Sequence, residues 1–310
     1  MQLAEALYRR IQEMNSDIII REATDRDGPE FIAMMNTYYR RKKDLSYYHW
    51  QFQHSQPSSK LFVAVQEEKV VACYGAQVLH LANGSACGFT VDLLIENDLR
   101  RRGVFVLLEK AVTEFLSDSG AVGLVSLPNP EGRNAHTWLE GWKEVGIIKT
   151  LTVSPGQMSR SMSGLAGDGL QKLSFSKSSE YLSWRFDANP VYTYTRLASD
   201  SESFAVVKIF VDPVTHLSYG DIVDVECNLD DPHAIQRAII KACEYLFSQN
   251  VGEITIWGLP HTSTGKVARA LGFRESTQER FFCVKVLKAG HEYLYDFANW
   301  HLVEADSEIY

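Results

Sequence analysis

The sequence predicts an α/β protein built from two similar modules, and two observations carry this prediction. Apolar stretches rich in β-branched residues, typical of buried strands, alternate with stretches in which apolar residues recur at helical spacing. The same order of strand, turn and long helix also occurs twice along the 310 residues. A chain of this length fits two domains of about 150 residues each.

The first predicted module covers residues 1–153. Segment 1–15 has the apolar spacing of an amphipathic helix rather than the pattern of a secretion signal. Short apolar runs bounded by turn residues then predict strands, and longer runs with helical spacing predict helices. The expected strands are 18–21, 61–66, 70–74, 77–82, 89–95, 121–127 and 147–153, and the expected helices are 30–41, 104–116 and 134–139. Residues 154–170, rich in glycine and serine, predict a linker.

The second predicted module, 171–310, repeats four short motifs of the first in the same order. Each repeat follows its counterpart by roughly 130 residues. The pairs are Trp50-x-Phe52 with Trp184-x-Phe186, Thr90–Leu93 with Ile222–Val225, Gly123–Pro128 with Glu253–Pro260, and Leu139–Trp142 with Ala270–Phe273. We therefore predict a duplicated module. The alternative is two domains that share only a generic succession of strands and helices.

Composition bounds the class of protein. A net charge of −8 argues against nucleic acid as the main partner, because proteins that bind it usually present a basic face. Five scattered cysteines, none with C-x-x-C spacing, predict neither a zinc site nor a thiol-redox motif. Their odd number favours a reducing, cytoplasmic location. No apolar run is long enough to span a membrane.

Residues 89–116 combine a buried strand, a polar turn and a helix. The turn runs through Arg100, Arg101 and Arg102 to Gly103. The first amides of a helix have no partner inside it, and arginine adds charge and forked donors, so the turn favours a phosphate or pyrophosphate. Gly103 has no Cβ, so we expect an oxygen-rich group to approach its backbone closely. We also expect the stability of the fold to tolerate substitution of Gly103, because helix starts accept many residues. The alternative is an ordinary helix start with solvated arginines.

The second module differs at this turn. It has Asn228-Leu-Asp-Asp-Pro-His233, in which two carboxylates would repel a phosphate and Pro232 removes an amide donor. We therefore expect one phosphate site, in the first module.

The turn resembles the signature of the GNAT superfamily of acyl-CoA-dependent N-acyltransferases, Arg/Gln-x-x-Gly-x-Gly/Ala between a strand and a helix. This chain has Arg100-x-x-Gly103-x-Phe105, with Phe105 where the family has a small residue. The resemblance covers residues 18–153, and 175–287 resembles a degenerate copy without the cofactor turn. It implies, for each module, a mixed, mostly antiparallel twisted sheet flanked by helices.

The resemblance also implies acyl-CoA as co-substrate, a small-molecule amine as acceptor, and no metal. The implied coenzyme A contacts are Leu93, Leu94 and Ile95 for the pantetheine arm, the turn residues Arg100, Arg101, Arg102, Gly103, Val104 and Phe105 for the pyrophosphate, and Asn129 at the end of a later strand. Two residues are candidates for proton transfer. Asp92 lies on a strand that the apolar pattern predicts to be buried. It is either a base or a group that orients the acceptor, or else a core carboxylate paired with another residue. His136 is either an acid or, as the residue pattern favours, a histidine on the surface of its helix.

An acceptor site is expected among the aromatic residues of the repeated Trp-x-Phe segments, with the second module lining it. The candidates are Tyr48, His49, Trp50, Trp184, Arg185 and Tyr192. The alternative is that the tryptophans are core residues. This layout is similar to that of acyltransferases of bacterial polysaccharide pathways, some of which acylate nucleotide-linked amino sugars. The resemblance thus implies an acceptor such as a dTDP-amino-dideoxyhexose and an acetyl or short hydroxyacyl donor, for example 3-hydroxybutanoyl. An aminoacyl-tRNA-dependent transferase and a non-catalytic coenzyme A or nucleotide-binding module are the alternative functions.

Overall fold

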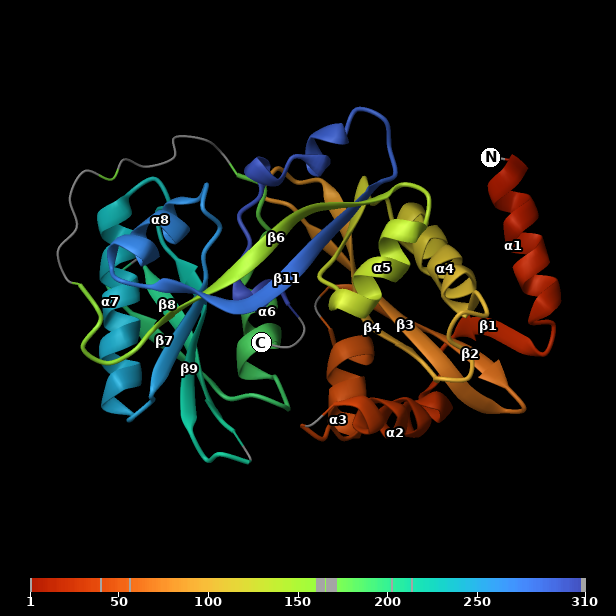
Figure 1. The fold of residues 1–310 in the computed structure, drawn as a ribbon, viewed down its shortest axis with the longest axis horizontal. Coiled ribbons are helices and arrows are strands. Elements are labelled where there is room, and N and C mark those ends of the chain that lie inside the picture. The colour runs from red at the N-terminus through yellow and green to blue at the C-terminus, as the bar shows by residue number, and fades with distance from the viewer. Residues whose placement is uncertain are drawn as a thin grey trace. The chain divides into compact units, whose positions relative to one another are not determined.

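The computed structural model describes residues 2–39, 41–55, 57–159, 165, 172–201, 203–212 and 214–307. The chain divides into two compact units (Figure 1). Unit 1 comprises residues 1–145, 175–191 and 282–295, and unit 2 comprises 146–174, 192–281 and 296–310. These limits differ from those of the predicted modules, because two segments of the second module, 175–191 and 282–295, make their contacts in unit 1.

Unit 1 is a mixed sheet covered by helices. Its strands follow the order β1-β2-β3-β4-β5-β11, and each neighbouring pair is antiparallel except β4 with β5. The strands are β1 (Ile18–Glu22), β2 (Ser58–Gln66), β3 (Lys69–His80), β4 (Ala86–Ile95), β5 (Gly123–Ser126), the start of β6 (Trp142–Val153) and the end of β11 (Arg274–Val286). The helices are α1 (Gln2–Met14), α2 (Gly28–Tyr38), α3 (Leu45–Tyr48), α4 (Val104–Asp118), α5 (Pro130–Trp138), α6 (Ser179–Leu182), the π-helical turns His49–Gln53 and Ser183–Asp187, and the 3₁₀ turns Asp25–Asp27 and Glu292–Tyr295.

Strand alternation explains why both faces of this sheet are buried. On β2, Phe62 and Ala64 belong to the core under α4, whereas Leu61 and Val63 belong to the core formed with α2 and α3. The helix α4 therefore lies on one face of the sheet and α2 with α3 on the other. The carboxyl end of β4 leads directly into the turn before α4.

Unit 2 contains the remaining strands of the sheet, which has eleven strands among the described residues. Its strands follow the order β6-β10-β9-β8-β7, and β9 and β10 are the parallel pair. The elements are β7 (Tyr194–Ala198), β8 (Phe204–Val211), β9 (Ser218–Glu226), α7 (Pro232–Ser248), β10 (Glu253–Trp257), α8 (Ser263–Ala270), the remaining parts of β6 and β11, and the 3₁₀ turns Phe297–Asn299 and Glu304–Asp306. Buried residues of β8, β9 and β10 form one apolar core with α7 and α8.

The predicted class, α/β with mostly antiparallel mixed sheets flanked by helices, is confirmed. Three element predictions are wrong. The strand expected at 147–153 already begins at Trp142. The expected strands 70–74 and 77–82 form the single strand β3, because Gly75 continues the ladder to both β2 and β4. The helix expected at 134–139 begins at Pro130, which a helix tolerates at its first position. Most of the predicted linker, 160–164 and 166–170, lies outside the described residues.

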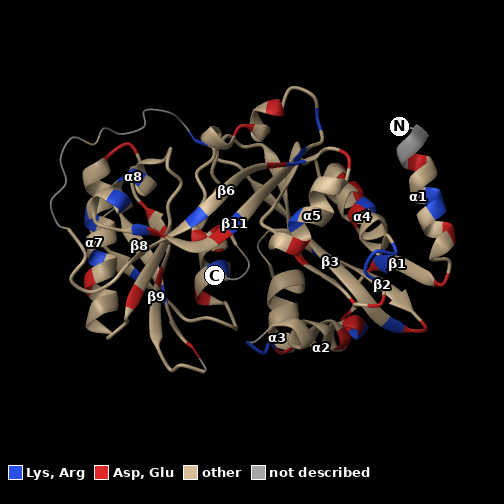
Figure 2. Cartoon of the chain, in the orientation of Figure 1, with Lys and Arg blue, Asp and Glu red and all other residues tan. Residues whose placement is uncertain are grey.

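Charged residues of both signs are interspersed over each unit (Figure 2). In the described part of the chain, every helix is too short or too polar to cross a membrane.

Candidate functional site

The parallel strands β4 and β5 of unit 1 pair over only part of β4, because β5 ends at Ser126. β4 pairs with β5 only through Gly88–Thr90, opposite Leu124–Ser126, although β4 continues to Ile95. On its other side, β4 stays paired with β3 as far as Ile95. The edge of residues 91–95 that faces away from β3 therefore has no strand partner among the described residues. An extended ligand with its own amides could pair with this edge, which includes the predicted pantetheine contacts Leu93, Leu94 and Ile95.

A β-bulge lies in the same stretch. The register of β3 with β4 shifts between Cys73 and Gly75, which places Asp92 and Leu93 together opposite Tyr74. Asp92 adopts a φ of 51°, a left-handed conformation that is uncommon outside glycine. The chain thus keeps a locally strained backbone at the residue that the sequence marked as a candidate base.

The Asp92 side chain is almost completely buried, with 1% of its surface exposed. Its carboxylate accepts the Tyr47 hydroxyl at 2.9 Å through Oδ2 and at 3.2 Å through Oδ1. Burial raises the pKa of Asp92, while the nearby Lys43 charge and the Tyr47 hydrogen bond act in the opposite direction. The Lys43 ammonium lies 3.5 Å from the centre of the Tyr47 ring. Tyr47 belongs to the aromatic residues among which the sequence predicts the acceptor site, but its hydrogen bond to Asp92 was not predicted, and Lys43 was assigned no role.

The turn between β4 and α4, Glu96–Gly103, is called the Arg-Gly turn below. Its first part is closed by hydrogen bonds from the amides of Leu99 and Arg100 to the Glu96 carbonyl. Arg101 and Gly103 are both left-handed, with φ of 70° and 85°. Gly103 is the N-cap of α4 and provides no side-chain cap.

The amides at the start of α4 are available as donors. In the described structure, the amides of Arg101, Gly103, Val104 and Phe105 donate to no backbone carbonyl. Alternating right- and left-handed residues with free amides form the concave donor arrangement that binds anions, and the helix dipole adds to it. The structure therefore brings together the elements of the predicted phosphate site.

The three arginines of the turn differ in their contacts. Arg100 donates through Nε to the Ile95 carbonyl at 3.3 Å and forms an ion pair with Glu131 at 3.6 Å. Arg102 approaches Asp17 at 3.8 Å. Both ion-pair partners, Glu131 and Asp17, lie at the surface, where ion pairs are weak. For Arg101, the described residues provide no ion-pair partner, so its charge is the most available of the three.

Gly103 is required for a different reason from the one expected. A Cβ at this position would lie 2.8 Å from Cγ2 of Ile11 on α1, and the φ of 85° would strain any L-residue. The predicted tolerance of the helix start to substitution is therefore wrong. The side chains of Val104 and Phe105 are buried in the core, so these two residues face the turn only with their backbone.

His136 is a core residue, and the interpretation as a surface histidine is wrong. Its side chain is 1% exposed. Nδ1 lies 2.7 Å from the Gly132 carbonyl oxygen, and because that oxygen can only accept, Nδ1 carries the proton and donates it. In the neutral ring Nε2 is then an acceptor, and it accepts the Tyr74 hydroxyl at 2.8 Å. Burial lowers the pKa of His136, and the bond to Gly132 opposes this shift. The neighbouring candidate Asn129 caps α5, because its side chain accepts the Gly132 amide.

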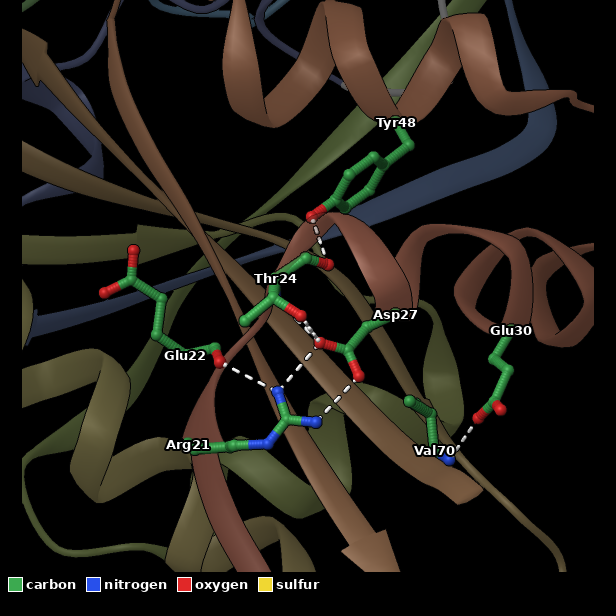
Figure 3. A network of polar contacts seen from close by, with 7 residues as sticks. All are labelled: Arg21, Glu22, Thr24, Asp27, Glu30, Tyr48 and Val70. Atoms are coloured by element: carbon green, nitrogen blue, oxygen red, sulfur yellow. Dashed lines mark hydrogen bonds and ion pairs between the residues drawn. The ribbon is translucent and has the colours of Figure 1, made fainter. Parts of the chain in front are cut away.

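Tyr48 and His49, two of the predicted acceptor residues, are held in local contacts. The Tyr48 hydroxyl donates to the Thr24 carbonyl at 3.1 Å, beside the bidentate ion pair of Arg21 with Asp27 (Figure 3). Burial raises the pKa of Tyr48 to about 12. His49 contacts the side chain of Gln53 one turn further along.

Trp50 and Trp184 form a symmetrical pair inside unit 1. Their rings stack with centroids 4.7 Å apart, and each indole N–H donates to the backbone carbonyl of the other residue, at 2.8 and 2.9 Å. Arg185 is 4% exposed. The burial of these three residues supports the alternative that the repeated tryptophans are core residues. Tyr192 lies in unit 2, where its ring is 4.2 Å from the Lys208 ammonium.

The corresponding turn of unit 2 has fewer free amides and a carboxylate at the start of its helix. Asp231 is the N-cap of α7, and its carboxylate accepts the His233 amide at 2.9 Å. Pro232 occupies the first helical position and has no amide hydrogen. In the described residues, no group of three His, Cys, Asp or Glu side chains is arranged to hold a metal ion in either unit.

No protein-family model and no curated protein sequence matches the chain. Solved structures share its fold. A putative acetyltransferase from Pyrococcus horikoshii aligns over 94% of this chain and 96% of its own, with 11% identity and a TM-score of 0.58. Saccharomyces cerevisiae N-myristoyltransferase with bound myristoyl-CoA aligns over 88% of this chain and 80% of its own, with 11% identity and a TM-score of 0.59.

A third similar structure is a GCN5-related glucosamine N-acetyltransferase region of a fungal GH3 beta-N-acetylglucosaminidase. It aligns over 86% of this chain with 12% identity and a TM-score of 0.55, and this chain spans 38% of that longer protein. Identities this low establish the fold alone, which is that of the GCN5-related N-acetyltransferases.

Proposed function

We propose that the protein is an acyl-CoA-dependent N-acyltransferase whose coenzyme A site lies in unit 1. The observation that carries the proposal is the uncapped start of α4, placed at the end of a strand whose outer edge is unpaired. The pyrophosphate would accept hydrogen bonds from the amides of the Arg-Gly turn, with Arg100, Arg101 and Arg102 adding charge. The pantetheine arm would pair with Leu93–Ile95 as an added strand.

Acyl transfer joins the acceptor nitrogen to the thioester carbonyl carbon and breaks the carbon–sulfur bond. The amine must lose a proton to a base, and the departing thiolate must gain one. Asp92 is our candidate for the base or for the group that orients the amine, with its carboxylate held by Tyr47. An amide of the bulged segment of β4 would stabilise the oxyanion. His136 would act only through the Tyr74 hydroxyl, to which it is bonded.

For the acceptor we propose the amino group of a nucleotide-linked amino-dideoxy sugar, with acetyl or a short hydroxyacyl group as donor. Its support is the similarity of the Trp-x-Phe layout to polysaccharide acyltransferases, together with the glucosamine N-acetyltransferase region among the structures of similar fold. In this proposal, the chain is a tandem of GNAT-like modules that acts in the cytoplasm, and the second module binds the acceptor.

Two measurements test the proposal. Calorimetry with coenzyme A should give one site per chain, and this site should be lost in the triple variant Arg100→Ala/Arg101→Ala/Arg102→Ala. A mass-spectrometric screen of acyl-CoAs against amino sugars, nucleotide sugars and other amines should then identify the acylated product. Two equivalent sites, or full affinity in the triple variant, would place the cofactor elsewhere.

A non-catalytic coenzyme A-binding module is the second candidate, because Asp92 and His136 are both buried and hydrogen-bonded. This candidate requires tight coenzyme A binding without acylation of any amine in the screen. Asp92→Asn separates the two: it should abolish turnover in an enzyme and leave coenzyme A affinity unchanged in both.

A further inference from the structure

The helix α1 reaches the Arg-Gly turn through one polar side chain. Asn15 follows the last residue of α1 and is 1% exposed. Its amide nitrogen donates to the Ile11 carbonyl at 2.8 Å, which closes the helix, and to the Arg102 carbonyl at 3.0 Å. Because both partners are carbonyls, the orientation of this amide group is fixed. Asn15 therefore joins the end of α1 to the turn, 87 residues further along the chain.

The same helix contacts the next residue of the turn. Ile11 is buried, and its Cγ2, Cδ1 and Cγ1 atoms are the three heavy atoms nearest to where a Cβ of Gly103 would lie, at 2.8, 3.2 and 3.2 Å. The end of α1 thus meets the turn at two neighbouring residues, through a hydrogen bond to the Arg102 carbonyl and through the Ile11 side chain beside Gly103.

The turn needs outside support for a physical reason. Arg101 and Gly103 are both left-handed, and such a conformation is unfavourable for arginine. The amides that would bind an anion cannot hold the turn themselves, since they have no carbonyl partner in the described structure. The turn has backbone hydrogen bonds of its own, among them Arg102 to the Leu99 carbonyl at 3.2 Å and Val106 to the Gly103 carbonyl at 2.9 Å, and contacts from elsewhere add to this support.

One atom of the Asn15 side chain is in an unfavourable environment, which the end of a helix alone does not require. Its Oδ1 is buried and has no hydrogen-bond partner among the described residues, which is unfavourable. The stabilising part of the residue is therefore its two donated bonds, and only one of them serves the helix. The other is directed at the turn.

We infer that Asn15 and Ile11 are positioning residues that keep the Arg-Gly turn in its anion-binding conformation. The inference rests on the proposed function, since it names the part of the fold that prepares the same site. It assigns to α1 a role in cofactor affinity that is separate from the chemistry at Asp92.

The experiment compares Asn15→Ala, Asn15→Ser and the control Tyr8→Ala in the full chain. Serine can still cap the end of α1 but is too short to reach the Arg102 carbonyl. Tyr8 lies on the same helix and contacts Lys110 on α4 rather than the turn. Both Asn15 variants should weaken coenzyme A binding by about five- to thirtyfold, the effect of one or two lost hydrogen bonds. The kcat at saturating acyl-CoA should stay within about twofold, because positioning residues act on binding, and Tyr8→Ala should leave affinity unchanged.

Amide hydrogen exchange without ligand gives a readout that does not depend on activity. Peptides covering residues 98–106 should exchange faster in both Asn15 variants and as in the unmodified protein in Tyr8→Ala. Unchanged exchange in this segment, or a fall in kcat equal to the fall in affinity, would overturn the inference. If the unmodified protein does not bind coenzyme A, the proposed function fails, and the exchange comparison still decides whether α1 holds the turn. If Asn15→Ala does not fold, Asn15→Ser carries the test.

Discussion

The helices α4 and α7 follow equivalent strands but begin with different residues. The helix α4 follows β4, which pairs in parallel with β5, and α7 follows β9, which pairs in parallel with β10. The start of α4 is a left-handed glycine without a side-chain cap, preceded by three arginines. The start of α7 is capped by the carboxylate of Asp231, and the first helical residue is Pro232. An anion site therefore requires donors that the protein itself leaves unpaired. The two turns differ in this respect by a few residues at one position of the chain.

The strands that precede these two helices, β4 and β9, each contain a β-bulge, and the two bulges also differ. Asp92 on β4 and Asp224 on β9 both lie where the register with the preceding strand shifts. In unit 1, the Asp92 carboxylate faces the Tyr47 hydroxyl. In unit 2, the Asp224 carboxylate accepts the amide of the following residue, Val225, at 2.9 Å. The two bulges are alike, and the Asp92 carboxylate differs from that of Asp224 in accepting a side-chain hydroxyl.

Exchanging the turns should have the largest effect. We expect replacement of residues 98–103 by the sequence of residues 228–233 to lower coenzyme A affinity more than a hundredfold. The replacement removes three positive charges and an amide, and it puts two carboxylates in place of the single one of Asp98. Calorimetry and thermal melting should be measured together. Retained affinity in a folded variant would show that the turn is not the anion site.

Gly103→Ala should have the next largest effect, on both affinity and stability. The left-handed φ and the contact with Ile11 should lower the free energy of unfolding by about 1–3 kcal/mol. Gly120, at the other end of α4, is the matched control, because it has a φ of 88° and a Cβ added there would have no atom within 4 Å. Gly120→Ala should show the backbone strain alone. Adding Ile11→Ala should recover part of the loss at Gly103, and equal losses at the two glycines would contradict a role for Ile11.

Local patterns in the sequence were sufficient to predict the strand, turn and helix of the candidate site. Arg100 to Gly103 is a contiguous segment, and the apolar spacing after it defines α4. The partners of Asp92 and Trp50 could not be predicted in this way. Tyr47 is 45 residues from Asp92 and Trp184 is 134 residues from Trp50, and strand or helix periodicity contains no information on such pairings.

His136 shows a different limit of sequence reasoning. The helix α5 has few apolar residues, so its pattern does not reveal which face is buried, and Trp138 is 69% exposed while His136 is 1% exposed. The assignment of residues 175–191 to unit 1 likewise depends on contacts between distant segments. The contact of α1 with the turn, which leaves no room for a side chain at position 103, was not predicted either, because α1 is far from Gly103 in sequence.

Tyr47→Phe should have a smaller effect that depends on pH. Burial already raises the pKa of Asp92, and loss of the Tyr47 hydroxyl, which favours the charged form, should raise it further. If the pKa of Asp92 is higher in the folded than in the unfolded chain, the protonated carboxyl adds to the free energy of unfolding at pH values below the unfolded pKa. This contribution to stability is lost as the pH rises through the folded pKa. The variant should therefore be less stable than the unmodified protein by about 1–3 kcal/mol at pH 8 and by much less near pH 3. If Asp92 is the base, the acidic limb of kcat against pH should move to higher pH.

Tyr48→Phe is the control for this pH dependence. The Tyr48 hydroxyl donates to a neutral carbonyl, and its pKa of about 12 keeps it protonated across the range. Its removal should change stability by the same amount at both pH values. A pH-independent loss in Tyr47→Phe as well would show that Asp92 does not change its charge over this range.

Asp231→Ala should have the smallest effect, and it tests unit 2. Its carboxylate caps α7 through the His233 amide, and removal of such a cap costs about 0.5–2 kcal/mol of stability. The substitution frees one amide and removes one negative charge, but Pro232 still lacks a donor and Asp230 still repels an anion. Denaturant unfolding should therefore show the loss in stability, while calorimetry shows unchanged affinity and a single coenzyme A site. A second site in Asp231→Ala would mean that the cap alone closes unit 2, and that the two turns differ by one carboxylate rather than by their whole sequence.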